Sequence, residues 1–227
     1  MNSPFPYKLA QTSDGSHTLK LIGHDEQYHS LNGALQESGH VFIQSGLMAL
    51  EPTLNPIHVL EIGMGTGLNA LLTAKYALEN KTRMIYDALE PYPIGWETAQ
   101  KLNYPSFFAD VDMLPLFQGI HQTGENEYEH IASYFSIRHH AQKLEDFMPE
   151  AGKYHLVYFD AFGPDTQPEM WKPEMFEKVF SGMKPGGYLV TYCVKGAVRR
   201  AMKAAGFQVE KLPGPAGKRE ISRATKP

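Results

Sequence analysis

The stretch HVLEIGMGTGLN, residues 58–69, decides the fold of this chain. Residues 58–62 are short, apolar and β-branched, which predicts a buried strand, and residues 68–78 carry apolar side chains at helical spacing. The turn between them holds three alternating glycines: Gly63, Gly65 and Gly67. These glycines let the backbone bend sharply and let a ligand approach the start of a helix. The dinucleotide fingerprint G-x-G-x-x-G is incomplete, because Leu68 occupies its last position.

Further strand and helix patterns alternate along the rest of the chain. Strands are expected at 83–89, 133–139, 155–160 and 188–194, and helices at 96–102, 144–148, 173–183 and 197–205. This alternation predicts a parallel sheet with helices on both faces. Residues 208–212 and 219–224 predict a final antiparallel hairpin, so the sheet should be mixed. The expected fold class is therefore α/β and Rossmann-like, with a mostly parallel sheet.

The beginning of the chain carries a different pattern. Residues 7–12 and 17–22 flank a short turn with a glycine, which predicts a β-hairpin. Residues 34–50 have apolar and small side chains that permit an interrupted helix. We therefore expect an N-terminal extension of hairpin and helix over residues 1–50, followed by the main domain over residues 51–227.

The composition excludes several classes of protein. The 227 residues are 42% hydrophobic and 20% charged, which is ordinary for a globular chain. A single cysteine excludes a disulfide scaffold, and no apolar run reaches the ~18 residues of a membrane span. The N-terminal residues lack the basic start and apolar stretch of a secretory signal. We expect a cytoplasmic protein without membrane contact.

Charge is distributed unevenly along the chain. Residues 195–227 hold nine Lys or Arg and two acids, a net charge of +7. The other 194 residues hold 12 Lys or Arg and 23 acids, a net charge of −11. A basic tail on an acidic body can bind a polyanion such as RNA. The alternative is a solvated helix and hairpin that happen to be rich in lysine.

Carboxylates follow two of the expected strands at the edge where open α/β sheets bind ligands. Glu90 ends the second strand, where it can accept hydrogen bonds from a ribose diol. Asp160 ends a buried strand and is expected to face the reactive end of a bound cofactor, although an aspartate that caps the following loop is the alternative. With Glu61 and the glycine turn, this arrangement resembles the class I S-adenosylmethionine methyltransferases.

The chain as a whole resembles the MnmC-type tRNA methyltransferases, as the methyltransferase unit without the FAD oxidase domain. The resemblance rests on Tyr28-x-Ser30 through Glu37-Ser38 to Val41-Phe42, EIGMGTGLN (61–69), YFDAFGPDTQPEMW (158–171), KPGGYLVTYC (184–193), VRRAMKAAGF (198–207) and GKRE (217–220). It implies S-adenosylmethionine-dependent methylation of the amine of 5-aminomethyl-(2-thio)uridine at the tRNA wobble position, which gives 5-methylaminomethyl-(2-thio)uridine. It also implies separate enzymes that supply the aminomethyl-uridine precursor.

The resemblance and the motifs together give a set of candidate site residues. For the cofactor these are Glu61, Gly63, Met64, Gly65, Thr66, Gly67, Asn69, Glu90, Pro91, Gln142, Asp160, Ala161 and Phe162. Gln142 stands where many relatives of this fold have an acid that holds the adenine amino group. Asp160 is the expected catalytic residue, which orients the amine and takes its proton. For the nucleoside and the tRNA phosphates the candidates are Tyr28, Ser30, Glu37, Phe162, Trp171, Lys195, Arg199, Arg200, Lys218 and Arg219.

Other functions stay open at this point. An aminopropyltransferase shares the fold, although such enzymes typically have a Gly-Gly-Gly-Asp-Gly turn in place of residues 63–67. A methyltransferase that acts on a small-molecule amine and a non-catalytic tRNA-binding module are the remaining alternatives. None of the ten histidines shows the spacing of metal ligands, so we expect no metal.

Overall fold

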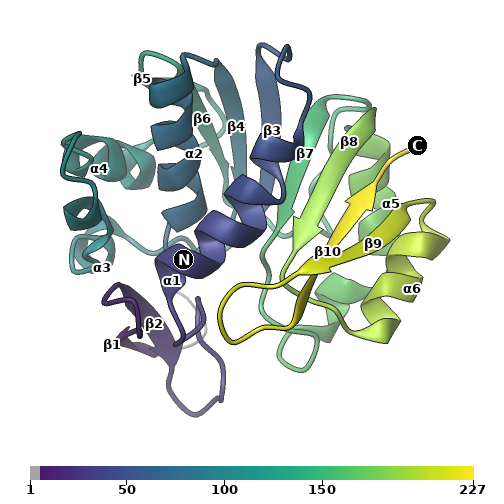
Figure 1. Ribbon diagram of the computed structural model, residues 1–227, viewed down its shortest axis with the longest axis horizontal. Coiled ribbons are helices and arrows are strands. Elements are labelled where there is room, and N and C mark those ends of the chain that lie inside the picture. Colours follow the sequence, from purple (N-terminus) through teal and green to yellow (C-terminus); the bar gives the residue numbers. More distant parts are fainter. Residues whose placement is uncertain (1–5) are drawn as a thin grey trace.

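A mixed sheet forms the centre of the computed structural model, which describes residues 6–227 (Figure 1). The strands are β3 (Ile57–Ile62), β4 (Met84–Leu89), β5 (Glu129–Ala132), β6 (Phe135–His140), β7 (Tyr154–Phe159), β8 (Met183–Thr191), β9 (Gln208–Pro213) and β10 (Glu220–Thr225). Within the described residues their order is β5-β6-β4-β3-β7-β8-β10-β9. The pairs from β6 to β8 are parallel, and both outer parts of the sheet are antiparallel. The predicted mixed, mostly parallel sheet is confirmed.

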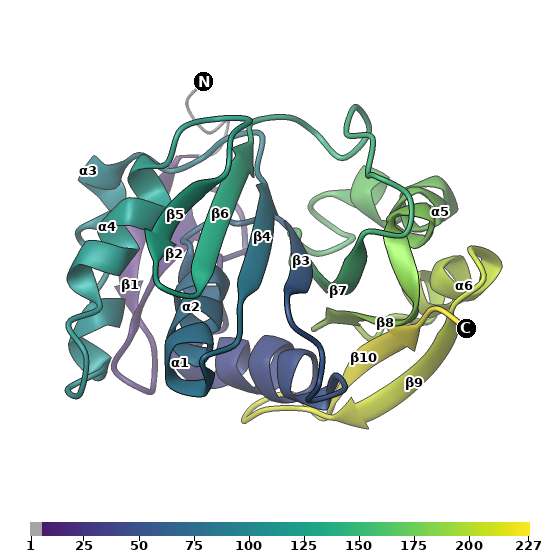
Figure 2. The ribbon, with the colours of Figure 1, turned by 90° about the horizontal axis from the view of Figure 1, so that it is seen from above.

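Helices cover both faces of this sheet, as predicted. They are α1 (Ala34–Ser38), α2 (Leu68–Asn80), α3 (Trp96–Ala99), α4 (Leu114–Gln122), α5 (Pro173–Gly182) and α6 (Gly196–Ala204), with a π-helical segment at Gly39–Gln44 and 3₁₀ turns at Leu47–Ala49, Tyr104–Phe107 and Pro168–Trp171. Figure 2 shows α1 and α2 on one face and α5 on the other. No helix in the described part of the chain is long and apolar enough to cross a membrane.

The apolar run of β3 is explained by burial on both faces. Neighbouring side chains of a strand point to opposite faces, so Val59 packs in the hydrophobic cluster beneath α2, and Leu60 packs in the cluster beneath α5. Both side chains are almost completely buried. Because β3 lies between β4 and β7, the ends of these three strands meet at one edge of the sheet.

The N-terminal segment is a hairpin followed by a short helical region. Strands β1 (Tyr7–Gln11) and β2 (His17–Leu21) pair with each other and form a sheet apart from the main one, which confirms the predicted hairpin. Phe42, from the helical region, is buried 5.2 Å from the ring of Tyr158 on β7, measured between ring centroids. The division at residue 50 stays a prediction, and residues 1–5 of the extension lie outside the described residues.

The helix expected at 144–148 is wrong. The segment makes a single turn, in which the Phe147 amide donates to the Lys143 carbonyl at 3.0 Å, and then continues as loop. Leu144 and Phe147 are buried, so their apolar character reports burial and not helical structure. Pro149 follows closely, and a proline disfavours helical conformation in the residue before it.

The strand expected at 188–194 also differs, because β8 begins at Met183 and ends at Thr191. A shift in register between Tyr154 and Leu156 of β7 accommodates the earlier start. Beyond the end of β8, the Cys193 amide donates to the Thr191 hydroxyl at 3.3 Å. This local bond turns the chain away from the strand.

A buried carboxylate lies on β4 beside the segment that lacks the expected helix. Asp87 is fully buried and accepts hydrogen bonds of 2.7–3.1 Å from side chains of the surrounding strands and loops: Tyr128, Arg138, Lys153 and Tyr154, with His140 Nε2 at 2.8 Å. Burial alone would raise the pKa of Asp87, but these hydrogen bonds outweigh it and hold the pKa well below its usual range. The cluster ties β4, β6 and β7 together.

Candidate active site

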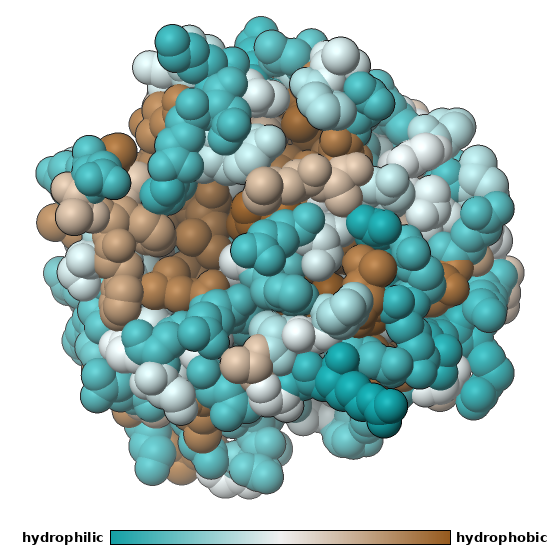
Figure 3. Space-filling model, viewed as in Figure 1, coloured by the Kyte–Doolittle hydropathy of each residue, from teal (hydrophilic) through white to brown (hydrophobic). Residues whose placement is uncertain are grey.

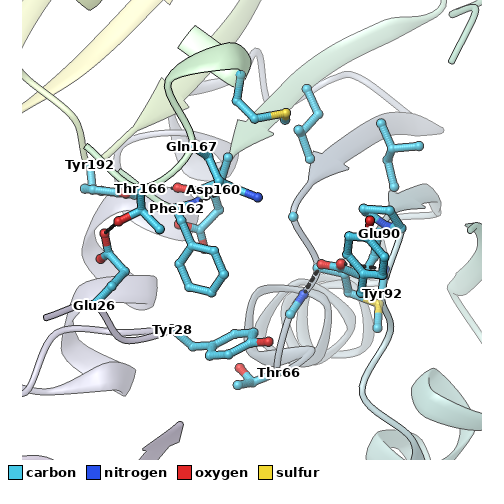
Figure 4. A pocket seen from close by; sticks show the side chains of 18 of the residues that line it. Glu26, Tyr28, Thr66, Glu90, Tyr92, Asp160, Phe162, Thr166, Gln167 and Tyr192 are labelled. Atoms are coloured by element: carbon cyan, nitrogen blue, oxygen red, sulfur yellow. Dashed lines mark hydrogen bonds between the residues drawn. The ribbon is translucent and has the colours of Figure 1, made fainter. Parts of the chain in front are cut away.

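A cavity of about 320 Å³ opens where the ends of β3, β4 and β7 meet (Figure 4). Its lining consists of residues 26–30, 62–66, 89–92, 143–145 and 160–162, together with Glu37, Thr166, Gln167, Glu169, Met170, Tyr192 and Lys218. The cavity therefore lies outside the carboxyl ends of the parallel strands, where open α/β sheets bind ligands. Segments from the N-terminal region and from the β9–β10 loop complete its walls.

The glycine turn forms one wall of this cavity and requires glycine for two separate reasons. Gly63 and Gly65 have φ angles of +86° and +50°, which other residues rarely adopt. A Cβ atom on Gly63 would lie 2.7 Å from the carbonyl oxygen of Asp160, and one on Gly65 would lie 2.7 Å from the Tyr28 ring. The turn is thus in close contact with the chain after β7 and with the N-terminal segment.

Glu90 directly follows β4 and points into the cavity. Its two carboxylate oxygens accept hydrogen bonds from the backbone amides of Gly65 at 3.1 Å and Tyr92 at 3.0 Å. Burial raises the pKa of Glu90, and these two bonds oppose the shift. A carboxylate oxygen can accept more than one hydrogen bond, so Glu90 can also accept from the hydroxyls of a ribose.

Asn69 links the acid at the end of β3 to the acid at the end of β7. Its side-chain amide donates to Glu61 Oε1 and to Asp160 Oδ2, both at 2.9 Å. Glu61 is fully buried and also accepts from the Tyr86 hydroxyl at 2.8 Å. Glu61 and Asn69 therefore lie behind the cavity lining and fix the position of Asp160 from below.

Asp160 is half-buried, and it faces the cavity. Burial raises its pKa to about 7, the negative charge of Glu37 adds to this effect, and the hydrogen bond from Asn69 opposes it. A carboxyl group with such a pKa can both accept and release a proton near neutral pH. This is the property that a general base needs, and the catalytic role of Asp160 stays a prediction.

Aromatic side chains stand next to Asp160. The rings of Tyr28 and Phe162 meet edge to face, with centroids 5.0 Å apart. Trp171 does not line the cavity: it is buried, and its indole N–H donates to the Phe162 carbonyl at 2.8 Å. The Tyr192 hydroxyl donates to the Ala161 carbonyl at 2.9 Å. The backbone on both sides of Phe162 is thereby anchored.

Glu37 joins the N-terminal segment to the β9–β10 loop. One carboxylate oxygen accepts from the Ser30 amide at 2.7 Å, and the other pairs with the Lys218 ammonium group. The Lys218 nitrogen also lies 4.2 Å above the centre of the Tyr192 ring. Of the residues predicted to contact the nucleoside or the tRNA phosphates, five line the cavity: Tyr28, Ser30, Glu37, Phe162 and Lys218.

Other predicted residues lie away from the cavity. Gln142 is outside the lining, whereas the three residues after it, 143–145, are part of it. Lys195 is exposed and forms an ion pair with Asp165. Arg199 and Arg200 on α6 and Arg219 in the β9–β10 loop are also outside the lining. Their roles stay predictions.

Several lining residues escaped the sequence analysis: Glu26, His29, Tyr92, Thr166, Gln167 and Tyr192. His29 Nε2 lies 2.6 Å from the Thr66 hydroxyl and so holds the glycine turn from the N-terminal side. Burial lowers the pKa of His29 to about 4, and the ring is therefore neutral at pH 7. The described residues contain no cluster of His, Cys, Asp or Glu that could hold a metal ion.

The sheet order, the glycine turn and the acids after β4 and β7 are those of the class I S-adenosylmethionine-dependent methyltransferase fold. Residues 120–227 match a family model described as S-adenosyl-L-methionine-dependent methyltransferase. The cofactor of this class is S-adenosylmethionine. The predicted class of enzyme is confirmed.

Within that class, the chain is similar to the MnmC proteins, and the resemblance predicted from the sequence is confirmed. It is 30% identical over 208 residues to the tRNA 5-methylaminomethyl-2-thiouridine biosynthesis bifunctional protein MnmC of Leptospira interrogans, and 31% identical over 213 residues to that of Idiomarina loihiensis. These matches cover 87% of this chain and 32% and 35% of the relatives, so the chain spans about a third of their length.

Solved structures share the fold. The structure of MnmC2 from Aquifex aeolicus has a TM-score of 0.76 at 23% identity, and the match covers 99% of this chain and 71% of that one. Spermidine synthase from Thermotoga maritima has a TM-score of 0.60 at 13% identity, over 100% of this chain and 72% of that one. At these identities the two matches establish the fold alone.

Proposed function

We propose that the protein methylates the amine of 5-aminomethyl-(2-thio)uridine at the wobble position of tRNA. The observation that carries the proposal is Asp160, a half-buried carboxylate in the cavity with a pKa raised to about 7 by burial. An amine acceptor needs such a base. The names of the similar proteins refer to the biosynthesis of 5-methylaminomethyl-2-thiouridine in tRNA, which supports this acceptor.

The residues of the cavity fit the cofactor. The glycine turn leaves space that Cβ atoms on Gly63 and Gly65 would occupy, and Glu90 offers a carboxylate to the ribose hydroxyls. When bound, S-adenosylmethionine supplies an electrophilic methyl group on a sulfonium centre. Residues 62–66 and 89–92 would hold it in the cavity that Asp160 also lines.

Before the amine can attack, Asp160 has to remove a proton from it. A primary amine with a pKa of ~10.4 is almost entirely protonated at pH 7 and then lacks the lone pair needed for attack. Burial acts on both partners, because it raises the pKa of a carboxyl group and lowers that of an ammonium group in the same cavity. Burial thus makes the difference between the two pKa values smaller and proton transfer to Asp160 easier, whereas neighbouring carboxylates act in the opposite direction by favouring the ammonium form.

The ammonium group would give one proton to Asp160, which frees the nitrogen lone pair to form a bond to the methyl carbon. The bound cofactor would supply that methyl group as an electrophile and leave as a neutral thioether that keeps the electrons of the broken carbon–sulfur bond. Asp160 afterwards releases its proton to water, which its pKa near 7 permits at neutral pH.

The tRNA would lie across the C-terminal part of the chain. Figure 3 shows hydrophilic residues over most of the right side of the view, around α6 and the β9–β10 hairpin. Arg199, Arg200 and Lys203 lie on α6, whereas Lys211 and Arg223 of the hairpin form ion pairs with acids. The three α6 cations would contact phosphates, which gives affinity that depends on salt and little on sequence.

The test uses tRNA that carries 5-aminomethyluridine at the wobble position. We expect incubation with S-adenosylmethionine to add one methyl group to that nucleoside, as seen by mass spectrometry of the digested tRNA, and to leave unmodified tRNA unchanged. Calorimetry with the cofactor alone runs in parallel. Cofactor binding without methylation of the aminomethyl nucleoside would refute the acceptor and leave the class of enzyme in place.

A further inference from the structure

We propose that Glu26 is a specificity-determining residue, which binds the positively charged amine of the acceptor on the side of the cavity next to Asp160. This inference rests on the proposed function and adds the residue that selects the acceptor. Glu26 lies in the loop after β2, a segment that the sequence analysis did not connect with the site. Figure 4 shows its side chain reaching toward Thr166, at the opposite end of the cavity from Glu90.

The Glu26 carboxylate is fixed in place but keeps its charge free for a ligand. Its Oε2 atom accepts a hydrogen bond from the Thr166 hydroxyl at 3.0 Å. Among the described residues, none of the ion pairs within 4.0 Å includes Glu26. A neutral hydroxyl orients the carboxylate and leaves its negative charge without a partner.

Gly163 keeps a small space open beside this carboxylate. A Cβ atom there would lie 3.3 Å from Glu26 Oε2 and 3.7 Å from the Tyr192 hydroxyl oxygen. That hydroxyl donates to the Ala161 carbonyl, directly after Asp160. The Phe162 ring stands between Glu26 and Glu90 in Figure 4. Glu26, Asp160 and Phe162 therefore line one end of the cavity, and Glu90 lines the other.

The charges at this end of the cavity favour a cation. Acids outnumber lysines in the cavity lining, which holds Glu26, Glu37, Glu90, Glu145, Asp160 and Glu169 against Lys143 and Lys218, and the ammonium group of Lys218 is already paired with Glu37. A ligand with an ammonium group on a short arm would supply the missing positive charge and donate charge-assisted hydrogen bonds. An aromatic face such as that of Phe162 also attracts a cation. A hydroxyl group in the same position would gain neither effect.

Glu26 and Asp160 would thus have different tasks toward one nitrogen. Glu26 attracts the ammonium form and holds it, and Asp160 removes the proton once the amine is in place. The two tasks predict different kinetic effects. Loss of Glu26 weakens binding and raises KM, whereas loss of Asp160 lowers kcat.

The test compares Glu26→Gln with Asp25→Asn. The Glu26→Gln change keeps the length of the side chain, and the new amide oxygen can still accept from Thr166; Asp25 is a matched control because its side chain is fully exposed in the same loop. The probes are the nucleosides 5-aminomethyluridine and 5-hydroxymethyluridine, titrated by calorimetry in the presence of S-adenosylhomocysteine. We expect the wild type and Asp25→Asn to prefer the amine by about tenfold or more, and Glu26→Gln to lose most of this preference.

Two further measurements separate the possible failures. With aminomethyl tRNA, Glu26→Gln should raise KM about tenfold at nearly unchanged kcat. Gly163→Ala should weaken the binding of both nucleosides to the same extent, because the added methyl group takes up space and leaves the charges unchanged. The inference is overturned by a wild type without amine preference, or by a Glu26→Gln variant that retains it. An amine preference that depends on Glu26, with no methylation of tRNA, would refute the proposed function and leave the inference standing.

Discussion

Replacing Asp160 by Asn should abolish methyl transfer and at the same time stabilise the fold at neutral and alkaline pH. In the folded protein, burial raises the pKa of Asp160 from 3.8 to about 7. Each unit of pKa shift corresponds to ~1.4 kcal/mol, so keeping this group ionised in the folded state costs up to ~4 kcal/mol. Asparagine cannot ionise, and its side-chain oxygen can still accept the hydrogen bond from Asn69.

The pH dependence has a definite sign. Between pH 3.8 and pH 7 the folded state holds the Asp160 proton and the unfolded state has lost it, so the wild type loses stability as pH rises through this window. From pH 5 to pH 8 the loss from this group alone is ~2.6 kcal/mol, and above pH 8 it is nearly complete. Titrating groups that do not interact with Asp160 act equally on both proteins and cancel in the comparison.

Urea unfolding of the wild type and Asp160→Asn at pH 5 and pH 8 measures this effect. We expect the advantage of the variant to grow by ~2.6 kcal/mol between the two pH values. Its kcat should fall at least ~100-fold at pH 8, where Asp160 of the wild type is ionised, as expected for loss of a general base. Wild-type kcat should rise as pH increases through 7, because Asp160 must be ionised to accept the proton.

The two readouts can fail separately. If the difference in unfolding free energy between the variant and the wild type is the same at pH 5 and pH 8, burial does not shift the pKa of Asp160. An asparagine variant that still methylates tRNA would remove Asp160 from its role as base. The same variant should bind the cofactor with nearly wild-type affinity, which excludes a collapsed site as the reason for lost activity.

The remaining predictions concern residues around the site. His29→Ala removes the bond to Thr66 and should weaken cofactor binding about fivefold by calorimetry, and unchanged affinity would contradict this support of the turn. Asp87→Asn leaves the partly buried Arg138 and Lys153 without their counter-charge and should cost ~3 kcal/mol in urea unfolding at pH 7; a loss smaller than ~1 kcal/mol would show that the cluster contributes little. The double variant Arg199→Gln and Arg200→Gln should weaken tRNA binding and reduce the slope of log binding constant against log salt concentration by ~1–2. An unchanged slope would show that these two arginines do not contact tRNA phosphates.

The sequence was informative wherever the signal is local. The glycine turn and the acids after β4 and β7 lie within a few residues of a strand end, so spacing alone assigns them to the correct edge of the sheet. Glu61 shows the limit of such reasoning. It was predicted to bind the cofactor, yet it lies outside the cavity lining and supports Asp160 through Asn69, and only the packing of side chains decides this.

Contacts between distant segments could not be predicted in the same way. His29 reaches Thr66 across 37 positions of the chain, and Glu26 reaches Thr166 across 140. Both start from a loop that carries no periodic pattern, so propensity gives no information about where the loop folds back. For Trp171 the sequence allowed a pocket wall and favoured core packing, and the buried ring supports Phe162 through a hydrogen bond to its carbonyl.

The contacts between the N-terminal segment and the glycine turn limit how many N-terminal residues can be removed from this protein. A truncation that begins at residue 51 would retain the main sheet and every glycine of the turn. It would remove the imidazole that holds Thr66, the ring that rests on Gly65 and the buried Phe42. We therefore expect such a fragment to bind the cofactor poorly, because the nucleotide-binding portion of the fold is not self-sufficient in this molecule.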